Sequence, residues 1–343
     1  MTHKFPYTWT LKDANFTKDR GTVFSCFSCG GGSTMGYKLA GFNVIGCNEI
    51  DEKMIETYKA NHNPKFAFLE GIQTFAERDD YPEELYNLDI LDGSPPCSSF
   101  STSGNRDKDW GKNKKFKEGQ AEQVLDTLFF DFIKLAKKLQ PKVVVAENVK
   151  GLLLGTAQKY VNKILLDLAD AGYYVDYVLL DGSDLGVPQR RERVFFYAIR
   201  KDLYKGEFAD LFQTRPVLNI DIKEPKIPFS QVQRSDVQRD GIAARDTAEW
   251  EKAARTGQAK KYGFLYRALG RRVCATILTG ARYCIEDEPL QFVDDEFSLV
   301  ASFPLDYNFL TNKAQYITGM SVPPVMMAHI ADAIYEQWLK GTK

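Results

Sequence analysis

The sequence predicts an α/β fold, in which buried strands are covered by helices on both faces, followed by a smaller irregular region. Residues 21–29 (GTVFSCFSC) form an apolar run that ends in a glycine cluster. A helical pattern and a second apolar run, NVIGCNEID, follow, and this alternation recurs as far as about residue 200. From about Lys201 the alternation stops and a polar stretch begins, which indicates a second domain or a large insertion.

The later elements are predicted from continuous apolar runs and from amphipathic patterns. Continuous apolar runs indicate strands that are covered on both faces, as in doubly wound parallel sheets. Helices are expected where apolar residues recur at helical spacing. The predicted strands are 88–91, 142–146, 173–180 and 193–199, and the predicted helices are 121–139, 160–171 and 325–339.

Length and composition limit the class of protein. The chain has 343 residues, of which 44% are hydrophobic and 27% charged, enough for one large domain or two modest ones. No stretch approaches the roughly 18–20 apolar residues of a membrane-spanning helix. The first twenty residues lack the apolar core and cleavage site of a secretory signal. We therefore expect a cytoplasmic protein whose six cysteines are thiols and form no disulfide frame.

The glycine cluster predicts a nucleoside-binding turn. Gly30, Gly31 and Gly32 lie between a strand and a helix, where backbone N–H groups can approach a ligand. Glu49 ends the next strand, 19 residues after Gly30, where an acidic side chain can bind ribose hydroxyls. Cys29 occupies the first glycine position of the dinucleotide motif, so a nucleoside cofactor without phosphates fits better. A glycine turn needed only for close packing is the alternative.

Cys97 is the candidate nucleophile. Residues 88–101 (LDILDGSPPCSSFS) place it just beyond a strand, on a Pro-Pro turn that is stiff because each ring fixes φ. A buried structural cysteine is the alternative, but the surrounding serines argue against it. Cys26 and Cys29 form a C-x-x-C, yet no second pair has the spacing of a four-ligand zinc site, so we predict no metal.

Three charged residues complete the candidate site. Glu147 ends an apolar strand, where partial burial would favour a protonated carboxyl that can donate a hydrogen bond or act as a general acid. A local cap or salt bridge is the alternative. Arg191 and Arg193 are two residues apart, so in an extended segment they share one face and can bind a phosphate or a base carbonyl.

These motifs together resemble those of the DNA (cytosine-5) methyltransferases of bacterial or phage type, over about residues 21–338. The resemblance lies in FSCGGGSTMGYKLAGF, NEID, SPPCSSFS, AENVKGLL, GVPQRRERV, ATILTGARYCIE, SFPLDY and GMSVPP, which follow the family's order and spacing. It implies a Rossmann-like S-adenosylmethionine-dependent methyltransferase domain, 1–204 and 306–343. It also implies a smaller, irregular target-recognition domain at 205–305.

The resemblance also implies an activity. A methyl group would pass from S-adenosylmethionine to carbon 5 of a cytosine flipped out of a specific double-stranded DNA sequence, through a covalent Cys97 adduct. Glu147 would contact N3 and the exocyclic amine, Arg193 the base carbonyl, and Arg191 would support the cysteine loop. The implied cofactor-binding residues are Phe27, Gly30, Gly32, Glu49, Ile50, Ile72, Pro96, Ser321 and Val322.

Several positions depart from the family pattern. Ser98 replaces a glutamine, Met320 replaces an asparagine, the third motif reads LEGI without its Asp-Ile pair, and 294–296 are acidic where an arginine is usual. None of these changes Cys97, Glu147 or Arg193, so we expect an active enzyme with altered cofactor contacts.

Three other functions each account for part of the sequence. A tRNA cytosine-5 methyltransferase of the same fold is the nearest alternative. The tRNA enzymes usually keep a Cys-Phe-Thr tripeptide, and its absence from this sequence favours DNA as the substrate. A nucleotide-dependent oxidoreductase would leave Cys97, Glu147 and both arginines without a role. A non-catalytic DNA-binding relative would require a damaged set of catalytic residues.

The net charge of −1 hides regions of opposite sign. Residues 106–117 hold six basic and two acidic residues, residues 231–282 hold eleven and five, and 283–306 hold seven acidic residues and no basic one. Solvated surface is the alternative for such runs. Their positions, beside the cysteine turn and in the recognition region, favour contact with DNA phosphates. We expect a monomer that binds double-stranded DNA more weakly as salt rises, with a cognate restriction endonuclease as a partner not required for activity.

Overall fold

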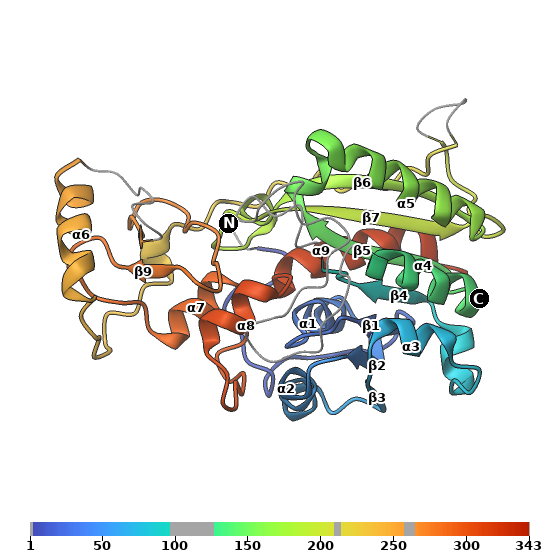
Figure 1. The fold of residues 1–343 in the computed structure, drawn as a ribbon, viewed down its shortest axis with the longest axis horizontal. Coiled ribbons are helices and arrows are strands. Elements are labelled where there is room, and N and C mark those ends of the chain that lie inside the picture. Colours follow the sequence, from blue (N-terminus) through green and yellow to red (C-terminus); the bar gives the residue numbers. More distant parts are fainter. Residues whose placement is uncertain (1–2, 97–126, 209–213, 257–264, 343) are drawn as a thin grey trace.

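A twisted sheet forms the centre of the computed structural model, which describes residues 3–96, 127–208, 214–256 and 265–342 (Figure 1). Seven strands stand in the order β3-β2-β1-β4-β5-β7-β6. Strands β1 to β5 are parallel, whereas β7 runs antiparallel to both of its neighbours. The bounds are β1 Thr22–Cys26, β2 Asn43–Glu49, β3 Phe66–Leu69, β4 Ile90–Gly93, β5 Val143–Val149, β6 Tyr173–Asp181 and β7 Glu192–Arg200.

Strand β7 departs from the parallel arrangement of the strands before it. Only residues 182–191 join β6 to β7, and their regular structure is a single 3₁₀ turn, Gly182–Leu185. A parallel neighbour would need a crossover of about a dozen residues or more, usually through a helix. The short connection therefore turns β7 back along β6.

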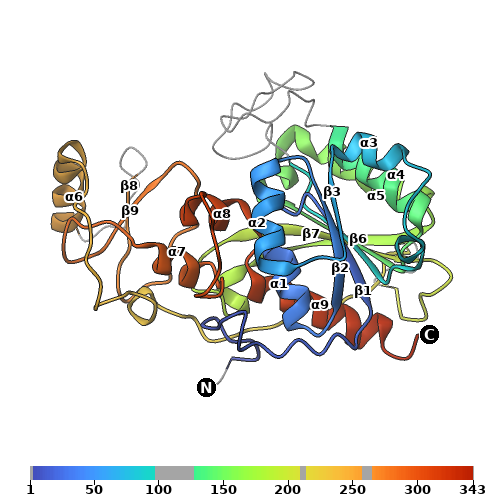
Figure 2. The same cartoon turned by 90° about the horizontal axis from the view of Figure 1, so that it is seen from below.

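Helices cover both faces of the sheet (Figure 2). One face carries α1 and α9, which pack against each other, and the other carries α3, α4 and α5. The bounds are α1 Gly32–Leu39, α2 Glu52–His62, α3 Ile72–Glu77, α4 Leu128–Leu139, α5 Gln158–Asp170 and α9 Pro324–Ile334. Among the described residues no helix has both the length and the apolarity needed to cross a membrane.

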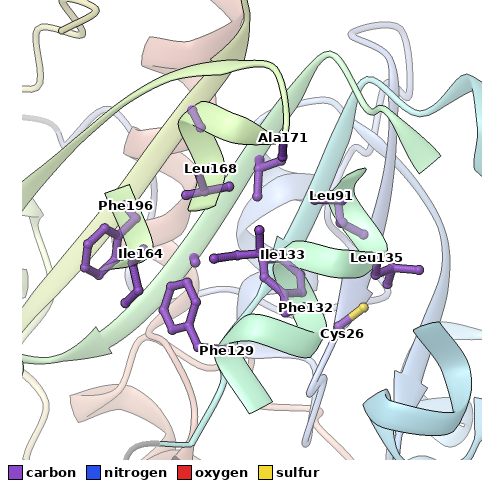
Figure 3. Close-up of a cluster of buried hydrophobic side chains, with 14 of the residues drawn as sticks. Cys26, Leu91, Phe129, Phe132, Ile133, Leu135, Ile164, Leu168, Ala171 and Phe196 are labelled. Carbon is purple, nitrogen blue, oxygen red and sulfur yellow. The ribbon is translucent and has the colours of Figure 1, made fainter. Parts of the chain in front are cut away.

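The core explains why the central strands read as continuous apolar runs. Along β5, Val144 and Ala146 join the cluster beneath α4 and α5, while Val143 and Val145 join the cluster beneath α1 and α9. Figure 3 shows the first cluster, where Phe129, Ile133 and Ile164 interlock between the helices and the sheet. Each such large side chain contributes about 1.5–3 kcal/mol when fully buried.

The predicted strands and helices are confirmed, with ends shifted by a few residues. The predicted helix 121–139 is described from Leu128, because 97–126 lie outside the described residues. The last predicted helix divides into α9 and a π-helical turn, Tyr335–Leu339. Helices α2 and α3 and strand β3 were not indicated by the sequence patterns.

A smaller lobe, residues 225–300, stands at one end of the sheet (Figures 1 and 2). It contains α6 Ala244–Thr256, α7 Asp294–Val300 and a parallel pair, β8 Leu265–Arg267 and β9 Arg282–Cys284; α8, Ala314–Met320, follows it. Aromatic rings form its core, with Phe229 stacked on Phe292 at 4.7 Å between ring centroids. Leu218 and Ile220, before the lobe, pack instead with the α9 side of the sheet.

Candidate active site

A pocket opens at the carboxyl ends of β1, β2 and β4, the edge where parallel sheets bind ligands. Five of the nine predicted cofactor-binding residues line it, namely Phe27, Glu49, Ile50, Ile72 and Pro96. The lining also includes Met320 and the Glu70-Gly71 part of LEGI, which were identified from the sequence as departures in the cofactor motifs. The residues that the sequence did not indicate as cofactor contacts are Cys29, Asn48, Met54, Ser94 and Tyr316. Cys29 and Asn48 are adjacent in sequence to a predicted residue and Ser94 lies two residues before Pro96, whereas Met54 comes from α2 and Tyr316 from α8.

The glycine loop between β1 and α1 is held by Glu49. Cys29 donates its backbone N–H to Glu49 Oε2 at 2.8 Å, and the backbone N–H groups of Ile50 and Asp51 donate to Oε1 at 2.8 and 3.0 Å. Burial raises the pKa of Glu49, although these three donors oppose the effect. An ionised carboxylate has about four lone-pair sites, so capacity is left for a ribose hydroxyl.

Four predicted cofactor residues lie behind the pocket wall. Gly30, Gly32, Ser321 and Val322 are buried and are not part of the lining. A Cβ on Gly32 would stand 2.2 Å from the Val322 carbonyl oxygen and 2.8 Å from Ser321 Cβ. Gly32 is therefore required for close packing of the loop on the segment that precedes α9. At this position the glycine turn has the packing role that was the alternative to cofactor binding.

Glu147 and Arg193 meet across neighbouring strands. Arg193 Nε donates to Glu147 Oε1 at 2.8 Å, and the side chains are only 15% and 12% exposed. The antiparallel pairing of β5 with β7 brings them together, because Val149 stands opposite Arg193 in the register. Burial lowers the pKa of the Arg193 guanidinium, and the charge of Glu147 opposes that effect. The structure thus joins two of the predicted catalytic residues.

Asn148 connects this pair to the cysteine turn. Its side chain is buried, and Nδ2 donates to the Pro95 carbonyl at 3.1 Å. Pro95 stands two residues before Cys97, and Pro96 lines the pocket. Cys97 itself and the basic segment 106–117 lie outside the described residues.

Arg191 braces two distant segments. Its guanidinium is buried and donates to the Gly319 carbonyl at 2.9 Å and to the Ile277 carbonyl at 3.4 Å. Burial lowers the pKa of Arg191 to about 9, and the nearby charge of Arg193 acts in the same direction. The side chain thus ties β7 to the smaller lobe and to α8, and its support of the cysteine loop remains a prediction.

Asp92 is a buried acid that sequence reasoning missed. It is 1% exposed and accepts hydrogen bonds from Ser25 Oγ at 2.7 Å and Tyr37 Oη at 3.2 Å. Burial raises the pKa of Asp92 to about 7, and the charge of Glu147 adds to the shift. Asp92 pairs in register with Val145, two residues before Glu147, so both acids lie on one face of the sheet. The sequence did contain a sign of this buried acid, because Asp92 lies inside the apolar run ILDG.

A second, basic concavity lies where the smaller lobe joins β7. We call it the junction pocket; it is lined by Arg190, Tyr266, Arg267, Ala268, Leu269, Arg272, Val273, Cys274, Ala275 and Tyr283. Arg190 and Arg272 are exposed, and neither pairs with an acid among the described residues. The guanidinium of Arg267 differs from these two, because it is held within the lobe and donates to the backbone carbonyl of Glu286 at 2.7 Å.

The described part of the chain holds five of the six cysteines. Five cysteines there are free thiols: Cys26, Cys29, Cys47, Cys274 and Cys284. Burial raises the pKa of Cys29 to about 12, so this pocket thiol stays protonated at neutral pH. No group of three His, Cys, Asp or Glu side chains that could hold a metal occurs among those same residues.

The sheet with its antiparallel β7, and the pocket at the carboxyl ends of its parallel strands, define a Rossmann-like methyltransferase fold. Solved structures share this fold, and two methyltransferases are among them. The Dnmt2 methyltransferase of S. pombe has a TM-score of 0.63 and 16% identity and covers 92% of this chain and 99% of its own. The methyltransferase EhMeth of Entamoeba histolytica has a TM-score of 0.59 and 17% identity, covering 92% and 98%.

Residues 21–336 match the family described as C-5 cytosine-specific DNA methylase, and the chain belongs to that family. The Type II methyltransferase M.Sau96I of Staphylococcus aureus is 30% identical over 334 residues, covering 89% of this chain and 73% of its own. M.NgoPII of Neisseria gonorrhoeae is 37% identical over 181 residues, which are 53% of this chain and 48% of its own. The chain thus spans about half the length of some relatives. The predicted family is confirmed.

Proposed function

We propose that the protein transfers a methyl group from S-adenosylmethionine to carbon 5 of cytosine in double-stranded DNA. The observation that carries the proposal is the Glu147–Arg193 pair. In a chain of this family, the pair lies at the carboxyl end of β5, on the same side of the sheet's strand ends as the cofactor pocket. We place the activity in the cytoplasm, on DNA, in a monomer. The Type II relatives make a cognate restriction endonuclease a reasonable partner.

The pocket suits S-adenosylmethionine by its chemistry. Its described lining contains two acids, Glu49 and Glu70, and no lysine or arginine, which favours a cationic nucleoside that carries no phosphate. Phe27, Ile50 and Ile72 supply the apolar surface that an adenine ring requires. When bound, the cofactor supplies an electrophilic methyl group.

Departures from the family pattern leave this lining intact. The LEGI segment still contributes Glu70, Gly71 and Ile72, and Asn48 Nδ2 holds the Glu70 carbonyl at 2.8 Å. Met320 lines the pocket with its thioether where the family usually has an amide. We therefore propose that binding is retained while one polar contact is lost.

The chain's own residues would activate the base. The Cys97 thiolate would add to carbon 6 of the flipped-out cytosine, which otherwise lies inaccessible within the stack. Carbon 5 would then take the methyl group, and loss of the carbon-5 proton with elimination of the Cys97 thiolate would restore the ring. Glu147, held by Arg193, would contact N3 and the exocyclic amine and stabilise the charge that develops on the ring. Arg193 would also hold the base carbonyl. Asn148, through Pro95, would keep the cysteine turn beside this pair.

DNA would lie between the two parts of the molecule. We propose 1–204 and 306–343 as the catalytic part and 205–305 as the part that reads the target sequence. The reading surface would belong to the smaller lobe, because Leu218 and Ile220 pack with the α9 side of the sheet. The exposed Arg190 and Arg272 of the junction pocket would contact DNA phosphates, because no described acid neutralises them and Arg190 stands three residues before Arg193.

Labelled methyl transfer tests the proposal. The protein is incubated with defined duplexes and S-adenosylmethionine labelled on the methyl group, and the product is mapped by bisulfite sequencing. We expect 5-methylcytosine at one sequence. Its absence from every duplex, with folded protein that binds the cofactor, would contradict the proposed activity.

A further inference from the structure

Two buried side chains hold one carbonyl of the glycine loop. Tyr307 Oη donates to the Gly30 carbonyl at 2.5 Å, and His62 Nε2 lies 3.3 Å from the same oxygen. Tyr307 is 5% exposed and His62 is 8% exposed. Because a carbonyl only accepts, this contact is a hydrogen bond in the tautomer that carries the proton on Nε2. Burial lowers the pKa of His62 to about 3, so the ring is neutral at physiological pH.

The same side chains leave no room for a larger residue in the loop. A Cβ on Gly30 would stand 2.5 Å from Ile317 Cγ2 and 2.7 Å from Tyr307 Oη. Gly31 has a φ of +82°, and a Cβ there would stand 2.2 Å from His62 Nε2. The loop is therefore enclosed by Tyr307, Ile317 and His62 on the side that faces away from the pocket.

Tyr307 comes from a segment that returns from the smaller lobe. We call residues 301–317 the return segment. It is fixed to α2, because Asn61 exchanges two 2.8 Å hydrogen bonds with the backbone of Asn308, and Asn312 Nδ2 donates to Thr57 Oγ1 at 2.8 Å. The return segment and α8, which begins within it, also contribute Tyr316 and Met320 to the pocket wall.

We propose that Tyr307 and His62 are positioning residues for the cofactor, so that the return segment is part of the cofactor site. They fix the Gly30 carbonyl, and through it the loop backbone that carries Phe27 and the Cys29 N–H bound to Glu49. Neither side chain lines the pocket, so their effect on the cofactor passes through the loop. This inference rests on the proposed function, because it takes S-adenosylmethionine as the ligand of that pocket.

Tyr307→Phe removes one donor and keeps the ring. We expect S-adenosylmethionine to bind about threefold to tenfold more weakly, the range expected when one buried hydrogen bond is lost. The KM for DNA, and kcat at saturating cofactor, should stay near the wild-type values. Tyr173→Phe is the matched control, since Tyr173 is also buried and its Oη donates to the Pro141 carbonyl at 2.9 Å, away from the site.

Calorimetric titration with S-adenosylmethionine, together with urea unfolding, separates positioning from stability. Both tyrosine variants should lose similar stability, but only Tyr307→Phe should raise the Kd. Equal cofactor affinity in the wild type and Tyr307→Phe would overturn this inference alone. A wild-type protein that does not bind the cofactor would overturn the proposed function and this inference with it.

A second pair of variants tests His62 independently. His62→Gln keeps an N–H donor near the position of Nε2, whereas His62→Leu removes it. We expect the glutamine variant to bind S-adenosylmethionine more tightly than the leucine variant. Equal Kd values for the two would contradict the role assigned to His62.

Discussion

Replacing Asp92 by asparagine should change how stability depends on pH. Asp92 is 1% exposed, and its carboxylate accepts hydrogen bonds from neutral hydroxyls, among them those of Ser25 and Tyr37. Its pKa rises from 3.8 to about 7, mainly through burial. Between these values the folded protein keeps a proton that the unfolded chain has released, so wild-type stability falls as pH rises.

The size of the effect follows from the shift. Each unit of pKa corresponds to about 1.4 kcal/mol, so a shift of about three units corresponds to about 4 kcal/mol between pH 4 and pH 7. Asp92→Asn cannot ionise. Its free energy of unfolding should therefore gain about 4 kcal/mol relative to the wild type as pH rises from 4 to 8, and the gain should level off above pH 7.

Urea unfolding followed by circular dichroism at several pH values measures this difference. Asp202→Asn is the control, because Asp202 is exposed and its hydrogen bond with Arg200 lowers its pKa. That variant should show only a small change, of opposite sign. A constant difference between the wild type and Asp92→Asn from pH 4 to 8 would refute the view that Asp92 is a carboxyl buried without a cation.

Two further predictions concern catalysis and DNA binding. Glu147→Gln removes the carboxylate that Arg193 holds and should lower kcat by about 10²–10⁴ with an unchanged Kd for S-adenosylmethionine; a near-normal kcat would exclude Glu147 as a catalytic group. The association constant for DNA, K, should fall as salt rises, and Arg272→Gln should make the slope of log K against log salt shallower by about 0.9. Arg234→Gln is the control and should change the slope less, because it removes a side chain that is paired with Asp236 and Asp295. Equal slopes for the wild type and Arg272→Gln would remove Arg272 from the DNA surface.

Local sequence patterns were sufficient for the central strands. Strand β5 is buried on both faces, so its run of valines was visible without any knowledge of its neighbours. The position of Glu147 in the site could be predicted for the same reason, because a charged residue that follows such an apolar run must lie where the buried strand ends. The family resemblance, carried by motifs spread over the chain, was likewise confirmed.

Contacts between residues distant in sequence could not be predicted in this way. Arg191 binds carbonyls 86 and 128 residues further along the chain, so its partners leave no local signal. Tyr316 reaches the cofactor pocket only because α8 folds back over the glycine loop. The reversed direction of β7 depends on the length of one connection, and the apolar pattern of a strand does not record its direction.

The most direct test of the central claim is covalent capture of the enzyme on DNA that contains 5-fluorocytosine at the target position. Fluorine at carbon 5 blocks the elimination that releases the enzyme, so a cysteine nucleophile remains attached after methyl transfer. The wild type, with S-adenosylmethionine, should form an adduct that survives denaturation, and Cys97→Ser should form none. An adduct that persists in Cys97→Ser would contradict the assignment of Cys97 as the nucleophile.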